Sequence, residues 1–218
     1  MENERIREWS LGYILDHWTR VTAIAVLIFT GIYIHTPFIA GGPESSIMAS
    51  MRFFHFVAAY ALILGLIVRV YMAFKSTFDA DWRDFGIVRN LKNLPDVLWY
   101  YLFIKGSHKE YRRYNPLQAF AYLFTALVIV FAALTGGALY HGHLFGFIPC
   151  PASFRWVSSL MGGESYTRIG HILAMWYFVI FVLIHVYMAI SITWINRDRT
   201  LTSIFTGWKL KKHEDSVR

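Results

Sequence analysis

Two histidines, His171 and His185, lie fourteen residues apart in one apolar stretch that runs from residue 166 to residue 196. In a helix they are separated by about 21 Å and return to within about 40° of the same face. A titratable ring in hydrocarbon is costly and indicates function, and a neutral imidazole is a common ligand of haem iron. The spacing predicts one such ligand near each side of a membrane. The plainer alternative is a hydrogen bond from each ring to a neighbouring helix.

The composition sets the class of protein that must position these rings. Of 218 residues, 56% are hydrophobic and 18% aromatic, which excludes an ordinary soluble domain and predicts an integral membrane protein. The charged start lacks a small-residue cleavage site, so no removable signal peptide is expected. The single cysteine, Cys150, excludes an intrachain disulfide and a cysteine-based iron–sulfur or zinc site made by this chain alone.

Four apolar runs predict transmembrane helices at about 13–37, 52–75, 117–141 and 167–195. Lysine and arginine are concentrated in the N-terminus, the connection 76–116 and the tail 196–218, whereas the other two connections carry only Arg155. The positive-inside rule then places both termini and the 76–116 connection in the cytoplasm. The net charge of +7 is explained by this orientation and predicts no nucleic-acid partner.

The sequence therefore predicts an all-α fold, a four-transmembrane-helix bundle that forms a single domain over residues 1–218 with N and C termini cytoplasmic. The aromatic segment 94–103 is too short for a fifth span and predicts an interfacial segment. The outer connection 142–166 mixes glycine, proline and aromatic residues, which suits either a surface for another protein or an ordinary ordered loop.

Depth in this bundle pairs the histidines across helices. The first span starts at the cytoplasm and carries His17, the second starts outside and carries His55, and the fourth runs inward past both His171 and His185. His55 is therefore expected to meet His171 at an outer level, and His17 to meet His185 at an inner level. Each pair is predicted to ligate one haem iron, which makes the bundle di-haem.

Further candidates share a helix face with these ligands. Gly31 follows His17 by fourteen residues, which puts a residue without a side chain at the outer level, where a macrocycle needs room. Arg69 follows His55 by the same interval and is a candidate partner for a haem propionate, with snorkelling to the headgroups as the alternative. Similar candidates for these two roles are Gly136, Gly137, Arg20, Arg52 and Arg168, with the same alternative of snorkelling for the arginines. No metal is assigned to His35, His141, His143, His108, His213, Met175 or Met188.

Three segments resemble the cytochrome b subunit of membrane-bound nickel–iron hydrogenases, a family related to the membrane subunit of respiratory formate dehydrogenases. The first is LDHWTRVTAIAVLIFTG, residues 15–31, which contains His17 and ends in Thr30 and Gly31. The second is RIGHILAMWYFVIFVLIH, residues 168–185, which contains His171 and His185. The third, residues 114–140, looks like the third span of that family.

The resemblance implies two haem b groups, with His55 and His171 as ligands of the outer one and His17 and His185 as ligands of the inner one. Electrons would pass from the iron–sulfur small subunit of a hydrogenase outside, through the outer and then the inner haem, to quinone. Asn115 and Gln118 occupy the place where the formate dehydrogenase relative contacts its quinone. The alternative for Asn115 is a helix N-cap.

The implied role is an electron-transfer and anchor subunit of a respiratory hydrogenase in the bacterial inner membrane. Its partners would be the small iron–sulfur and large nickel–iron subunits, membrane lipid and a pool of menaquinone or ubiquinone. Quinone would be reduced in this chain, and hydrogen would be activated in a partner. Three alternatives stay open: a cytochrome b of a formate dehydrogenase or sulfur-compound reductase, a stand-alone quinol-oxidising di-haem cytochrome b, and a transporter or bare membrane anchor.

Overall fold

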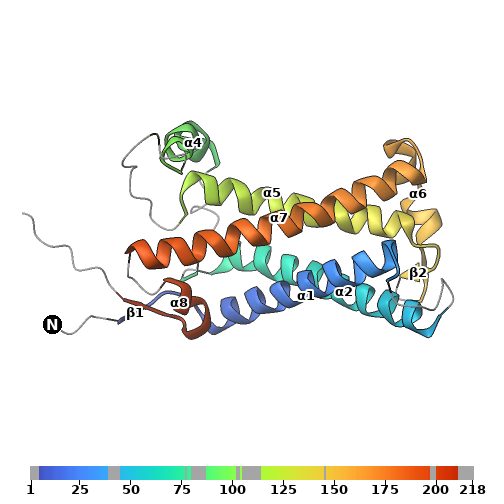
Figure 1. Ribbon diagram of the computed structural model, residues 1–218, viewed down its shortest axis with the longest axis horizontal. Helices are drawn as coiled ribbons and strands as arrows, with labels where there is room; N and C mark the ends of the chain where they lie inside the picture. Colours follow the sequence, from blue (N-terminus) through green and yellow to red (C-terminus); the bar gives the residue numbers. More distant parts are fainter. Residues whose placement is uncertain are drawn as a thin grey trace, which may run out of the picture.

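Four long helices run along the length of the molecule in the computed structural model (Figure 1). They are α1 (Leu11–His35), α2 (Ser46–Lys75), α5 (Pro116–Leu139) and α7 (Glu164–Asn196). Each is long and apolar enough to cross a membrane. The structure describes residues 5–38, 45–76, 78–79, 87–101, 104, 114–144, 146–196 and 200–210. The predicted all-α bundle of four membrane helices is confirmed, and the chain is a multi-pass membrane protein.

The helix ends follow from local capping. The hydroxyl of Ser10 accepts a hydrogen bond from the Tyr13 amide at 3.1 Å and so caps α1. Ser45 accepts one from the Met48 amide at 3.2 Å, and α2 therefore begins at Ser46, six residues before the predicted start at 52. Apolar runs mark the hydrocarbon-spanning part of a helix, whereas a serine cap lets the helix continue into more polar sequence.

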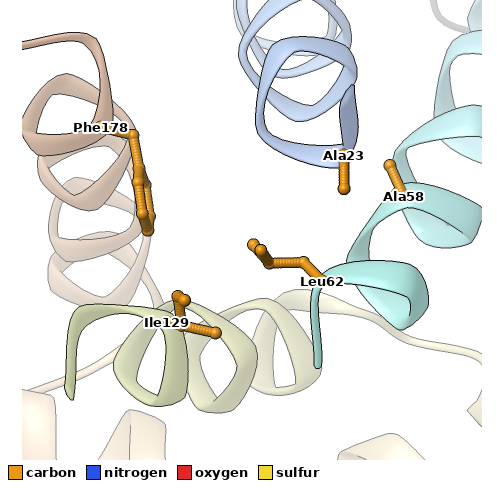
Figure 2. Close-up of a cluster of buried hydrophobic side chains, with 5 residues drawn as sticks. All are labelled: Ala23, Ala58, Leu62, Ile129 and Phe178. Carbon is orange, nitrogen blue, oxygen red and sulfur yellow. The ribbon is translucent and has the colours of Figure 1, made fainter. Parts of the chain in front are cut away.

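The long helices pack mainly as two pairs, α1 along α2 and α5 along α7. The pairs meet in a buried apolar cluster near mid-length, which draws side chains from all four helices (Figure 2). Its members are Ala23, Ala58, Leu62, Ile129 and Phe178. Many large apolar side chains elsewhere on these helices are exposed, as expected for a surface covered by lipid.

Both described ends of the chain lie at one end of the bundle. Strand β1 (Arg5–Arg7) pairs antiparallel with β4 (Trp208–Leu210), and the short helix α8 (Thr200–Thr206) precedes β4 (Figure 1). An even number of membrane crossings requires this arrangement. That this end faces the cytoplasm rests on the distribution of charge and stays a prediction.

The opposite end of the bundle carries a hairpin and a helix that the sequence patterns do not predict. Strands β2 (His143–Leu144) and β3 (Ile148–Pro149) form a small hairpin, and helix α6 (Cys150–Met161) follows, where only a loop or partner surface is expected. The ring of Phe154 on α6 lies close to the backbone of Gly137 on α5, because a Cβ on this glycine would lie 3.1 Å from it. Glycine at 137 thus allows α6 to pack closely.

The predicted cytoplasmic connection is described only in part. Helix α4 (Ile87–Tyr101) contains Pro95 and extends the expected interfacial segment toward the N-terminus. It packs near α5. His108 and His213 lie outside the described residues.

Gly65 is the position in α2 where a side chain is least tolerable. A Cβ there would lie 2.7 Å from Cγ of Arg20, whose guanidinium is held by Asp16 and cannot easily move aside. We expect Gly65→Ala to lower the free energy of unfolding by about 1–3 kcal/mol through overpacking. Thermal unfolding in detergent, followed by circular dichroism, measures the change. Gly12→Ala is the control, because a Cβ there would lie an ordinary 3.9 Å from Oγ of Ser10. Equal melting temperatures for the two variants would contradict the prediction.

Candidate functional site

His55 on α2 and His171 on α7 face each other near one end of the bundle. Their ring centroids are 6.3 Å apart, and the ring planes are inclined by 59°. Both residues are only partly exposed. The structure thus brings together the two residues that their depth in the sequence pairs.

His17 on α1 and His185 on α7 form the equivalent pair near the other end. Their ring centroids are 6.4 Å apart, with an interplanar angle of 40°. The ring of Phe181 stacks on His185 at 5.6 Å, and Trp18 lies edge-on to His17 at 5.4 Å. Helix α7 therefore supplies one ring to each pair, and the two rings lie fourteen residues apart along it.

The separation within each pair fits one metal ion between two imidazoles. A bond from an imidazole nitrogen to a metal is about 2 Å long, so two rings on opposite sides of one ion have centres about 6 Å apart. No hydrogen bond joins the two rings of either pair among the described contacts. A haem requires only two protein ligands because its porphyrin supplies the other four, and no group of three or more His, Cys, Asp or Glu side chains occurs in the described part of the chain. Each pair therefore fits a haem.

Two buried threonines hold the rings of the His55–His171 pair. Oγ1 of Thr30 on α1 lies 2.9 Å from Nδ1 of His55, and Oγ1 of Thr135 on α5 lies 3.0 Å from Nδ1 of His171. Each threonine belongs to the helix that is paired with the helix of its histidine. Nothing in the sequence alone assigns a role to either residue, although both precede a glycine in an apolar helix, which is a signal that could have found them.

Glycine follows each of these threonines and lies against the same ring. A Cβ on Gly31 would lie 3.5 Å from Cε1 of His55, and a Cβ on Gly136 would lie 3.2 Å from Cε1 of His171. Gly31 was expected at this level on the basis of spacing, and the structure puts it there. Its contact with a haem stays a prediction.

The His17–His185 pair has a different surrounding. Nδ1 of His17 is buried and has no hydrogen-bond partner among the described residues. An orphaned imidazole nitrogen in an apolar interior is unfavourable unless a group that the protein chain does not supply is bound nearby. The adjacent residue, Asp16, is buried and forms an ion pair with Arg20 at 2.6 Å.

The arginines proposed as propionate partners differ in the side chains that surround them. Arg20 pairs with Asp16, and Arg168 pairs with Glu164 at 2.9 Å on the surface. The guanidinium of Arg69 lies 5.4 Å from the ring centroid of Tyr13. Arg52 on α2 is exposed. A role of Arg69 or Arg52 toward a haem stays a prediction, whereas carboxylates one turn away already engage Arg20 and Arg168.

Asn115 and Gln118 form a capping box at the start of α5. The side chain of Asn115 accepts from the amide of Gln118 at 2.9 Å, and that of Gln118 accepts from the amide of Asn115 at 3.1 Å. The cap role that the sequence allows for Asn115 is therefore present. Contact of either residue with quinone stays a prediction.

The remaining candidates are three exposed histidines, Cys150 and Met175, and of these Met175 lies close to the His55 ring. His35, His141 and His143 are exposed, and His141 is 3.9 Å from a carboxylate oxygen of Glu164. Cys150 is fully buried at the start of α6. Met175 packs near Gly31, since its Sδ would lie 3.7 Å from a Cβ there.

Comparison with known proteins identifies the family. Residues 8–207 match the family described as prokaryotic cytochrome b561. The chain belongs to this family. It is also 32% identical over 226 residues to the probable Ni/Fe-hydrogenase B-type cytochrome subunit of Azotobacter vinelandii, covering 97% of this chain and 93% of that relative. The Cupriavidus necator protein of the same description is 32% identical over 91% of this chain and 84% of its own length. The probable Ni/Fe-hydrogenase 1 B-type cytochrome subunit of Escherichia coli is 31% identical over 90% and 87%.

Membership in the prokaryotic cytochrome b561 family implies a haem b group. Such a group is held by axial side chains, and imidazole nitrogens are common ligands. In this cytochrome the two facing histidine pairs are the described residues whose geometry fits that requirement.

Close to the His17 end of this cytochrome, Tyr114 and Tyr13 join in a buried hydrogen bond. Their hydroxyl oxygens are 3.0 Å apart. Burial raises the pKa of Tyr114 well above its usual value of 10.0, and the neighbouring Tyr13 and Tyr122 add to the shift. The phenol therefore stays protonated in the folded state at a pH where it ionises in an unfolded chain.

Alkaline pH should therefore destabilise the protein partly through Tyr114. Above pH about 10 the unfolded chain loses this proton while the folded chain keeps it, so stability falls as pH rises from there toward the higher folded-state pKa. We expect Tyr114→Phe to lose less stability between pH 9 and 11 than the wild type, measured as the fall in melting temperature in detergent. Tyr71→Phe, at a tyrosine that is 63% exposed, is the control and should behave like the wild type. An unchanged alkaline slope in Tyr114→Phe would refute this.

Proposed function

We propose that this chain is the electron-transfer and membrane-anchor subunit of a respiratory nickel–iron hydrogenase, and that it holds two haem b groups. The observation that carries the proposal is the presence of two facing imidazole pairs, at 6.3 and 6.4 Å, which share helix α7 and lie fourteen residues apart on it. One pair would make a single binding site. Two pairs at different depths make a path across the bilayer.

In this proposal His55 and His171 ligate the outer haem, and His17 and His185 ligate the inner haem. Haem supplies reversible one-electron chemistry, so electrons from the iron–sulfur clusters of a small subunit would pass from the outer to the inner level and then to quinone. The chain fixes the four imidazoles on three helices. Between the levels it places buried apolar side chains, including Leu62, Ile129 and Phe178 (Figure 2).

Assignment to a hydrogenase is supported by the relatives. The proteins from Azotobacter vinelandii, Cupriavidus necator and Escherichia coli are all described as cytochrome subunits of Ni/Fe hydrogenases, and each alignment covers at least 90% of this chain. The large and small subunits would bind at the end that carries α6, and the basic segments would face the cytoplasm of a bacterial inner membrane. Menaquinone or ubiquinone would react near the inner level, where Asn115 and Gln118 are the candidate contacts, whereas Arg69 is a candidate contact of the inner haem.

Haem stoichiometry tests the two-site proposal. The purified chain should contain two haem b per polypeptide in a pyridine haemochrome assay. Both His171→Ala and His185→Ala should contain one, because each removes one ligand from one pair. His35→Ala, at an exposed histidine on the same bundle, should retain two. A wild-type count of one, or loss of both haems in only one α7 variant, would contradict two independent pairs.

Co-purification tests the partner. In mild detergent the tagged chain should bring with it a nickel–iron enzyme, and the complex should reduce a quinone with hydrogen. His185→Ala should abolish quinone reduction while hydrogen-dependent reduction of a soluble dye by the partner survives, because hydrogen is activated elsewhere. A formate-oxidising or sulfur-compound-reducing partner, or an isolated chain that oxidises quinol, would instead identify one of the alternatives.

A further inference from the structure

The two threonines at the His55–His171 pair form the same arrangement twice. Thr30 and His55 belong to the α1–α2 pair of helices, and Thr135 and His171 belong to the α5–α7 pair. Both threonines are almost fully buried, at 2% and 0% exposure. A repeated contact between unrelated helix pairs, in a hydrophobic interior, indicates a common requirement of the two rings.

The direction of each hydrogen bond follows from the single proton of a hydroxyl. Oγ1 of Thr30 lies 2.6 Å from the carbonyl oxygen of Val26, and Oγ1 of Thr135 lies 2.8 Å from that of Phe131. Each hydroxyl donates to this carbonyl, so toward the ring it can only accept. The imidazole therefore donates from Nδ1–H, and Nε2 carries the lone pair. An oxygen that already donates is also a better acceptor, because such chains of hydrogen bonds polarise one another.

Glycine completes the arrangement on the carbon side of each ring. Gly31 and Gly136 present bare backbone to Cε1, where a methyl group on Gly136 would already be tight at 3.2 Å. Thr–Gly therefore contacts two adjacent atoms of the imidazole edge and restricts rotation of the ring. The remaining nitrogen, Nε2, is the one left for a metal.

We propose that Thr30 and Thr135 are positioning residues that hold His55 and His171 in the Nδ1–H tautomer and lower the midpoint potential of the haem bound between them. The inference rests on the proposed function. A hydrogen bond that accepts from the far nitrogen of a ligating imidazole makes the ring a stronger electron donor, which stabilises the oxidised metal. The described residues supply no such acceptor to Nδ1 of His17. The hydroxyls thus favour electron flow from the His55–His171 level toward the His17–His185 level.

The test is an optical redox titration of single-haem chains. In a His185→Ala background only the His55–His171 haem remains, and there Thr30→Val and Thr135→Val should each shift the midpoint potential upward. Thr30→Ser and Thr135→Ser retain the hydroxyl and should titrate like the background. In a His171→Ala background, where only the other haem remains, Thr30→Val should have no effect.

Thr125 offers a matched control. It also lies on α5, donates to a carbonyl one turn back at 2.7 Å and contacts a polar group on α7, but that group is the hydroxyl of Tyr177. Thr125→Val should therefore lower stability as much as Thr135→Val does and leave the potential unchanged. An equal shift in Thr125→Val, or serine variants that shift as far as the valine variants, would overturn the inference.

Loss of haem is read separately from the shift in potential. Removing a group that orients a metal ligand typically weakens metal binding about 10–100-fold. Loss of haem from Thr135→Val alone, with retention in Thr135→Ser and Thr125→Val, supports the positioning role, and the potential is then read from Thr30→Val. Retained haem with an unmoved potential in both valine variants overturns the inference. The haem count of the wild type tests the proposed function, so the two failures are distinguishable.

Discussion

An imidazole in hydrocarbon has two ring nitrogens to satisfy and no water to satisfy them. At His55 and His171 a threonine hydroxyl on a neighbouring helix satisfies one of the two ring nitrogens by accepting a hydrogen bond from it. The same hydroxyl donates a hydrogen bond to a backbone carbonyl of its own helix. The other nitrogen then carries a lone pair that no described side chain uses. Two such rings, with centroids 6.3 Å apart, fit one metal ion between them, and the helices must be arranged to keep both rings in place.

The arrangement of the helices follows from that constraint. Within each helix pair a threonine supports a histidine, and between the pairs the histidines face each other. Helix α7 supplies a ring at both levels, so its unbroken course fixes their separation at about 21 Å of rise. The apolar cluster of Ala23, Leu62 and Phe178 and their neighbours lies between the levels and keeps the two helix pairs together. Each long helix therefore has both a packing role and a site role.

Much of this could be predicted from the sequence because it depends on position along a single axis. Hydropathy gave the number of spans, and depth paired His17 with His185 and His55 with His171. Which side of a helix faces its neighbour depends on packing and cannot be predicted from hydropathy or depth. The contact of Thr135 with His171 therefore has no signal in the sequence of α5 alone. Hydropathy predicts a later start for α2 than the structure has, because the cap at Ser45 extends the helix beyond the apolar run. Helix α6 packs against Gly137 through Phe154, and such a contact between segments distant in sequence has no local signal.

The two levels differ in the groups that surround them, and the difference bears on where quinone would react. The side chains bonded directly to His55 and His171 are neutral hydroxyls, and the backbone of Ala132 also interacts with His171. Next to His17 the buried Asp16 forms an ion pair with the partly exposed Arg20, and the hydrogen-bonded phenols of Tyr13 and Tyr114 lie at the same end of the bundle. Reduction of a quinone takes up protons as well as electrons, so it requires protonatable groups within reach. Electron transfer alone requires none. Under the proposed function, the polar end would therefore suit exchange with quinone, and the threonine-supported end would suit exchange of electrons with a protein partner.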